Sequence, residues 1–264
     1  MSKASIAVLA VALILCLVVT PQAAHATVTT ITPSSADTFL TSGDPGVNYG
    51  TSTALRIISG AGVQPDRIVV KFVLSSIPSG STINTASLQL YYYDRVVGDP
   101  VGRTYTANRV TTDWVEGTCN GCNPPPPGAT WTTTDGTTNW GTAGGDFTAT
   151  GAASQTVPAT FGYITWDVTT IVKAWIEGGQ PNYGFLIKDV NENVGGFTDA
   201  WFYAREQGSS MPILTVDYTG PAGAPVGGVV MPANTLALVA PWFAVIGLVA
   251  CIATVVVVAK KRRA

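Results

Sequence analysis

The sequence predicts an all-β domain, a β-sandwich of about nine strands with one short helix, between two apolar chain ends. Short runs rich in Val, Ile, Thr and Tyr alternate with Gly, Pro, Ser and Asn turns, a spacing typical of all-β proteins. Long amphipathic helices are not indicated before residue 236. Residues 27–235 also have the usual length of a single sandwich or barrel.

The strand candidates are short, and the last one shows the clearest alternation. Within 213–218, Leu214, Val216 and Tyr218 share one face, while Thr215 and Asp217 share the other. Strands with alternating faces favour two packed antiparallel sheets. The candidates are 37–41, 54–59, 67–74, 86–93, 105–111, 162–167, 184–189, 200–205 and 213–218.

One helix is expected after the sixth candidate strand. Asp167 is a good N-cap residue, and apolar residues that include Trp175 follow at helical spacing. Gly178 and Gly179 end the run. We expect Trp175 to fill the core beneath the sandwich.

The N-terminal segment 1–26 has the pattern of a secretory signal peptide. Lys3 precedes an uncharged apolar run over 6–19, and Ala-His-Ala at 24–26 gives a small-x-small cleavage site. An uncleaved membrane helix is the alternative, but the run is shorter than the roughly 20 residues that a span needs.

The C-terminal segment predicts a membrane anchor. Residues 236–259 carry no charge, and four consecutive cations follow in the tail 260–264. As a helix, 24 residues extend about 36 Å, which is enough for a hydrocarbon core of about 30 Å. The basic tail places the C-terminus in the cytoplasm. The Gly/Pro/Ala-rich stretch 219–235 is then a linker, and the β domain lies at the cell surface.

Composition excludes several classes of function. Residues 27–235 contain nine Lys and Arg against sixteen Asp and Glu, a net charge of −7, which argues against nucleic acid as a partner. The only histidine, His25, lies in the predicted signal peptide. The mature chain therefore lacks Ser-His-Asp and Cys-His catalytic machinery and any zinc site that uses histidine.

Two cysteines lie in the predicted β domain. Cys119 and Cys122 form a CxxC pair with no second pair to complete a zinc site. Outside the membrane, a local disulfide is the favoured interpretation.

The segment 116–157 is a long stretch rich in Gly, Pro, Thr and Asn that also holds Trp131 and Trp140. A loop of this length inside a compact domain is functional, disordered, or a misread pair of strands. Its cysteines and tryptophans argue against disorder.

Six motifs in order resemble a known family. They are DTFLTSGDPGVNYGTSTALRI, KFVLSSIPSGSTINTASLQLYYY, RVTTDWVEGT, ATWTTTDG with WGTAGGDF, WDVTTIVKAWIEGGQPNYGFLIK and FYAREQGSSMPILTVDY. Together they resemble the DNRLRE domain, which is similar to carbohydrate-binding module family 96 and to disaggregatase-related domains of archaea. The tail from residue 226 onward also resembles C-terminal anchors of archaeal surface proteins.

The resemblance implies a β-jelly-roll fold and binding of a polysaccharide or cell-envelope glycan. The expected function is that of a membrane-anchored, non-catalytic, extracellular polysaccharide-binding module. Aromatic rings stack on sugar faces. The main candidate binding residues are Trp131 and Trp140, and Tyr49 and Arg109 are secondary candidates. The alternative for the two tryptophans is a place in the core.

Two other functions stay open at this point. The first is a structural or adhesive envelope protein without a dedicated small ligand. The second is a glycan hydrolase or lyase, for which Asp113 and Glu116 are the carboxylates close in sequence.

A structural calcium ion is a further expectation. Oxygen-rich loops offer Asp44, Asn48 and Asp146 as candidate ligands. No other cofactor is expected.

Overall fold

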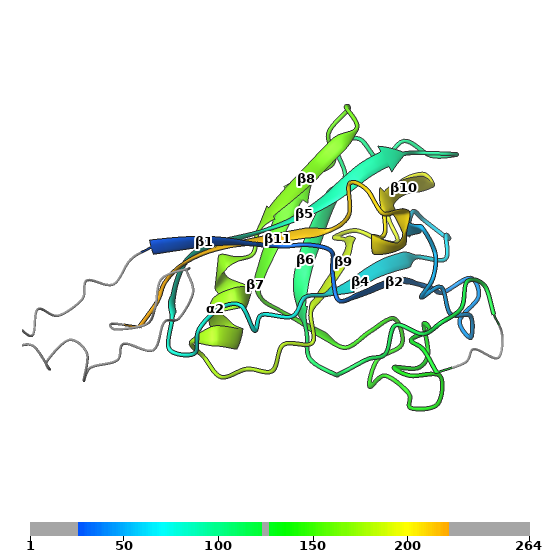
Figure 1. Ribbon diagram of the computed structural model, residues 1–264. Coiled ribbons are helices and arrows are strands. Elements are labelled where there is room, and N and C mark those ends of the chain that lie inside the picture. The colour runs from blue at the N-terminus through cyan, green and yellow to red at the C-terminus, as the bar shows by residue number, and fades with distance from the viewer. Residues whose placement is uncertain (1–25, 123–126, 222–264) are drawn as a thin grey trace, which may run out of the picture. The chain divides into compact units, whose positions relative to one another are not determined.

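The computed structural model describes residues 26–122 and 127–221 (Figure 1). This part of the chain is mostly β, with one α-helix, α2 (Thr169–Ile176), and one 3₁₀ turn, η2 (Arg205–Gln207). Its strands are β1 (Ala26–Ile31), β2 (Ala36–Thr41), β3 (Ala54–Ser59), β4 (Asp66–Lys71), β5 (Thr82–Asp94), β6 (Thr104–Val110), β7 (Phe147–Thr156), β8 (Gly162–Asp167), β9 (Phe185–Asp189), β10 (Thr198–Tyr203) and β11 (Ile213–Thr219).

The strands form one curled antiparallel sheet. Its main path runs β1-β11-β5-β10-β3-β4-β9-β6-β7, while β2 pairs with β4 and β8 pairs with β5. The long strand β5 therefore has β8 along one edge, and β11 followed by β10 along the other. Figure 1 shows β5, β8 and β11 crossing the domain above β2 and β4.

The predicted sandwich of two separate sheets is corrected by this topology. Strand β10 pairs with β3 over its whole length and also with the end of β5, so the two halves of the fold are hydrogen-bonded to each other. The register shifts between Trp201 and Phe202 where β10 meets β5. A bulge of this kind bends and twists a strand, and the sheet curls instead of dividing in two.

The nine predicted strands are all present, and two further strands were missed. Strand β7 lies inside the long segment 116–157, so part of that segment was a misread strand. Strand β1 pairs with β11 in continuous register from Ala26 to Ile31. It begins at the last residue of the predicted signal peptide.

Helix α2 confirms the expected position but not the expected cap. The N-cap residue is Val168, without a side-chain cap hydrogen bond. The N-cap is therefore one residue further along than predicted, and the Asp167 carboxylate accepts hydrogen bonds from the backbone N–H and hydroxyl of Thr169. Trp175 is buried in the core, as expected.

The concave face of the sheet holds the main core. Alternate residues of β3, β4, β5, β6, β8, β9, β10 and β11 point inward, and α2 adds its apolar face. Trp166 of β8 is completely buried there, and its indole N–H donates to the carbonyl of Tyr105 on β6 at 3.0 Å. Packing across the curl thus joins strands that are not neighbours in the sheet.

Among the described residues, no helix is long and apolar enough to cross a membrane. The predicted anchor 236–259 and tail 260–264 lie outside the described residues, as do most of the predicted signal peptide and linker.

Replacing Trp166 tests this core. We expect Trp166→Ala to lower the free energy of unfolding by about 3–5 kcal/mol, because it removes a large buried ring and leaves a cavity. Val28→Ala, at a side chain that is 65% exposed, is the control. Chemical denaturation measures both, and equal effects of the two substitutions would contradict the described packing.

Candidate functional site

The convex face of the sheet is covered over one half. Val69 and Leu186 point away from the main core, because their sequence neighbours face into it, and Val110 belongs to the same second cluster. Trp114, which precedes the long segment, and Trp140 within it pack on them and form a second, smaller core with further residues. The long segment therefore closes the outer side of β4, β9 and β6.

The other half of the convex face, on β5, β8 and β10, carries a row of tyrosines. Tyr91 and Tyr93 lie on either side of the fully buried Tyr92 in β5, so they point outward. Tyr163 of β8 lies directly opposite Tyr91 and is 40% exposed. Tyr203 of β10 is the fourth member of this tyrosine row.

The four rings contact one another across three strands. The ring of Tyr203 stacks on Tyr93 with centroids 4.2 Å apart, and on Tyr91 at 5.5 Å. Tyr163 meets Tyr91 edge to face at 5.1 Å. These contacts fix the rings at defined spacings, so a ligand that binds them need not order them first.

Polar side chains adjoin the tyrosine row on the same face. The amide of Gln89, two residues before Tyr91, donates to the hydroxyl of Thr165 at 3.1 Å. Burial and the neighbouring carboxylate of Asp94 raise the pKa of Tyr93 above its ordinary value of 10.0, so the phenol stays protonated at neutral pH. A neutral phenol both donates and accepts hydrogen bonds.

This combination can bind a flat, hydroxyl-rich ligand. The aromatic carbons offer apolar area, and the phenol, amide and hydroxyl groups on the same face of the sheet offer hydrogen bonds. Nothing in the row is a nucleophile activated by a neighbouring base. The surface is therefore suited to binding.

Trp131 lies beside the convex face and contacts the charged side chain of Arg67. The guanidinium sits 4.8 Å from the centre of the Trp131 ring and makes a two-pronged ion pair with Glu192 at 2.7 and 2.9 Å. Gly144 has a positive φ of 89°, and a Cβ there would lie 2.7 Å from the indole. Trp131 thus keeps only part of its ring surface exposed.

Among the described residues, the remaining predicted binding residues make no ring contact with the tyrosine row. Trp140 is only 5% exposed and its indole N–H donates to the carbonyl of Thr130 at 2.9 Å, which is the core alternative stated above. Tyr49 is half-buried and stacks on Phe39 at 4.2 Å. Arg109 is half-exposed on β6, opposite Thr148 of β7. Their roles in ligand binding stay predictions.

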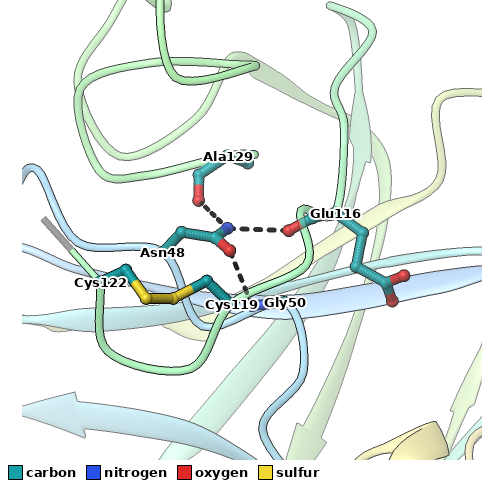
Figure 2. The surroundings of a disulfide bond; sticks show 6 residues. All are labelled: Asn48, Gly50, Glu116, Cys119, Cys122 and Ala129. Carbon is teal, nitrogen blue, oxygen red and sulfur yellow. Dashed lines mark hydrogen bonds between the residues drawn. A yellow bond between two sulfur atoms is a disulfide. The ribbon is translucent and has the colours of Figure 1, made fainter. Parts of the chain in front are cut away.

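The loop that holds CxxC is fixed by Asn48 (Figure 2). The fully buried Asn48 amide donates to the carbonyls of Glu116 and Ala129 at 2.8 and 2.9 Å, and its oxygen accepts from the N–H of Gly50. A Cβ on Gly117, where φ is 90°, would lie 2.3 Å from the Asn48 side chain. Glycine is required here for both space and backbone conformation.

The structure joins Cys119 to Cys122, with Cα atoms 6.0 Å apart (Figure 2). The ring that they close lies against the backbone of Asn48, which pairs with Gly121 and Cys122. The pair shapes the loop, as the sequence favoured. Mass spectrometry of the chain before and after reduction checks the bond by the gain of two hydrogen atoms.

The predicted calcium ligands are held by different parts of the protein. Asp146 accepts hydrogen bonds from Gly141, Thr142 and Thr112, whereas Asn48 is bound by the groups described above. Asp44 is exposed in its loop. Asn48 and Asp146 share no hydrogen-bond partner among residues 26–122 and 127–221, and a calcium site built from them stays a prediction.

Sequence reasoning missed the tyrosine row although a signal was present. In the run Tyr91-Tyr92-Tyr93, strand alternation puts the outer two on the face opposite the middle one. Aromatic residues at solvent-facing strand positions indicate a binding surface. The pairing of β5 with β8 and β10, which brings Tyr163 and Tyr203 alongside, was not readable from the sequence.

A model of carbohydrate-binding module family 96 matches residues 27–142 and 128–218, which together span the whole described sheet. The chain belongs to carbohydrate-binding module family 96. This confirms the resemblance read from the six motifs. Curated proteins give no match to the chain. All four residues of the tyrosine row lie within the family 96 segment, and membership is consistent with a non-catalytic module.

Removing the Asn48 amide tests how the loop of this family 96 module is held. We expect Asn48→Ala to lower the free energy of unfolding by roughly 2–5 kcal/mol, because two buried carbonyls lose their donor. Asn84→Ala is the matched control, since the Asn84 amide makes exposed hydrogen bonds to Asp217 and Thr219. Chemical denaturation in which both variants match the wild type would contradict this role.

Proposed function

We propose that this family 96 module binds a polysaccharide on the tyrosine row and is displayed outside the cell by its C-terminal apolar segment. The observation that carries the proposal is the contiguous set of four partly exposed tyrosines on the uncovered half of the sheet. Family membership supplies the ligand class.

A polysaccharide fits this surface better than a small compact ligand. The tyrosines span three adjacent strands, β8, β5 and β10. Neighbouring strands lie about 4.8 Å apart, so the row extends over roughly 10 Å and matches more than one sugar ring. An extended chain can contact several tyrosines at once, whereas a single sugar reaches few of them.

Charge favours a neutral glycan. The region 27–235 carries a net charge of −7. Asp94 lies beside Tyr93, and Asp167 and Asp217 lie on outward positions of the strands β8 and β11. An anionic chain would be repelled unless cations bridged it to the protein.

The carboxylates that suggested catalysis are engaged elsewhere. Asp113 pairs with Lys71 at 2.7 Å, and Glu116 pairs with Arg205 at 2.8 Å. Glycoside hydrolysis needs two carboxyl groups that flank a substrate bond. Both ion pairs belong to loop packing, which supports a binding role without bond cleavage.

Display at the surface is supported by the sequence. The uncharged run 236–259 is long enough to span a bilayer, and the four cations after it favour a cytoplasmic tail. Together with the predicted signal peptide, this orientation supports display of the family 96 module outside the cell as a single-pass membrane protein.

Substitutions in the tyrosine row test the binding site. We expect Tyr163→Ala and Tyr91→Ala each to weaken binding about three- to tenfold, since one aromatic contact contributes about 0.5–1.5 kcal/mol. Pull-down of the full-length protein on insoluble glucan, chitin and cell-wall glycan, with alginate gel as the anionic comparison, measures the affinity.

Trp131→Ala is the matched control, because this aromatic residue lies on the covered half of the face. Its binding should equal that of the wild type. Loss of binding in Trp131→Ala, together with unchanged binding in both tyrosine variants, would place the site on the long segment instead.

A further inference from the structure

Three carboxylates from distant parts of the chain converge at one edge of β2. Asp37 lies in β2, Glu116 in the segment after β6, and Glu206 in η2. One oxygen atom from each group lies within 4.8 Å of the other two. This acidic triad is separate from the tyrosine row and from the predicted ligands Asp44, Asn48 and Asp146.

Protein groups donate hydrogen bonds to, or pair with, at least one oxygen of each carboxylate in the acidic triad. Asp37 Oδ2 accepts from the hydroxyl of Ser34 and from the backbone N–H of Arg205. Glu116 Oε1 accepts from the backbone N–H of Asp37 at 2.7 Å, and its Oε2 pairs with Arg205 Nη2 at 2.8 Å. Glu206 Oε1 pairs with Arg205 Nε at 2.8 Å. The carboxylates are therefore fixed in position.

Two carboxylate oxygens of the acidic triad have no donor. Asp37 Oδ1 and Glu206 Oε2 are both buried and accept no hydrogen bond from the described residues. Asp37 as a whole is only 1% exposed. A buried carboxylate oxygen without a partner is strongly unfavourable, so its position indicates a ligand that the protein groups do not supply.

The negative charge of the acidic triad is also not balanced by the protein groups around it. Three carboxyl groups lie beside one guanidinium, that of Arg205. One guanidinium balances the charge of a single carboxylate, whereas a bound divalent cation would balance the other two.

We propose that Asp37, Glu116 and Glu206 bind one hard divalent cation, with Ca²⁺ as the ion that fits best. Calcium takes carboxylate oxygens at about 2.3–2.6 Å, so oxygens up to roughly 5 Å apart can share one ion. The separation within the acidic triad meets this condition. Oxygen-only ligands favour a hard cation over softer metals, and calcium accepts a wider range of ligand arrangements than magnesium, which requires a near-ideal octahedron.

The cation would join three segments of the fold. It would tie β2 to the segment after β6 and to η2, next to the point where β10 ends. Arg205 pairs with two of the carboxylates, those of Glu116 and Glu206. The rival arrangement is a proton on Asp37 Oδ1 in place of the metal, which the following experiment separates from the proposal.

Calcium binding to the purified full-length chain tests the proposal. After removal of metals with a chelator, equilibrium dialysis against CaCl₂ should show one tightly bound Ca²⁺, and the thermal unfolding midpoint should rise on adding it. Asp37→Asn and Glu206→Gln should each weaken the affinity by at least about tenfold, since loss of even an outer partner weakens metal binding by about 10–100-fold.

Asp44→Asn is the matched control, because Asp44 is an exposed loop carboxylate outside the acidic triad. Its calcium affinity should equal that of the wild type. The proposal is overturned if the wild type binds no Ca²⁺ and shows no calcium-dependent unfolding shift, which is the behaviour of a protonated Asp37. It is also overturned if Asp44→Asn loses the ion while Glu206→Gln keeps it.

Discussion

The fold depends on the junction between β5 and β10. Phe202 of β10 lies opposite Tyr92 of β5, and both rings are buried in the concave core. Because β10 also pairs with β3, this junction connects the β5 half of the sheet to the β4 half. The curl of the sheet around its core follows from this single change of partner.

The same junction creates the surface that we assign to ligand binding. Side chains alternate along both strands, so burying Tyr92 and Phe202 turns Tyr91, Tyr93 and Tyr203 outward. Tyr163 joins them because β8 pairs with β5 in register. The binding surface is therefore built on regular strands, which hold side chains more rigidly than loops do.

The long segment gives the two halves of the convex face different roles. Over β4, β9 and β6 it places Trp140 beside Trp114 in a second core, and buried hydrogen bonds to Asn48 fix it there. Over β5, β8 and β10 the face stays open. Trp140 packs in the second core and Trp131 lies on Arg67, whereas the tyrosine row stays partly exposed on the other half.

The sequence predicted what local patterns control. The nine strands, the position of α2 and the burial of Trp175 follow from alternation and helical spacing. Strand β7 was missed because its Gly, Ala, Thr and Ser residues have little apolar alternation. The branched pairing of β10 and the meeting of Asp37 with Glu116 and Glu206 depend on contacts between distant residues, which no local pattern encodes.

We assign glycan binding to the open half of the convex face and not to the half covered by the long segment. Hydroxyl-radical footprinting with and without polysaccharide tests this assignment most directly. Bound glycan should protect Tyr91, Tyr163 and Tyr203 from oxidation, while the reactivity of Trp131 stays unchanged. Protection of Trp131 with no change at the three tyrosines would contradict the account.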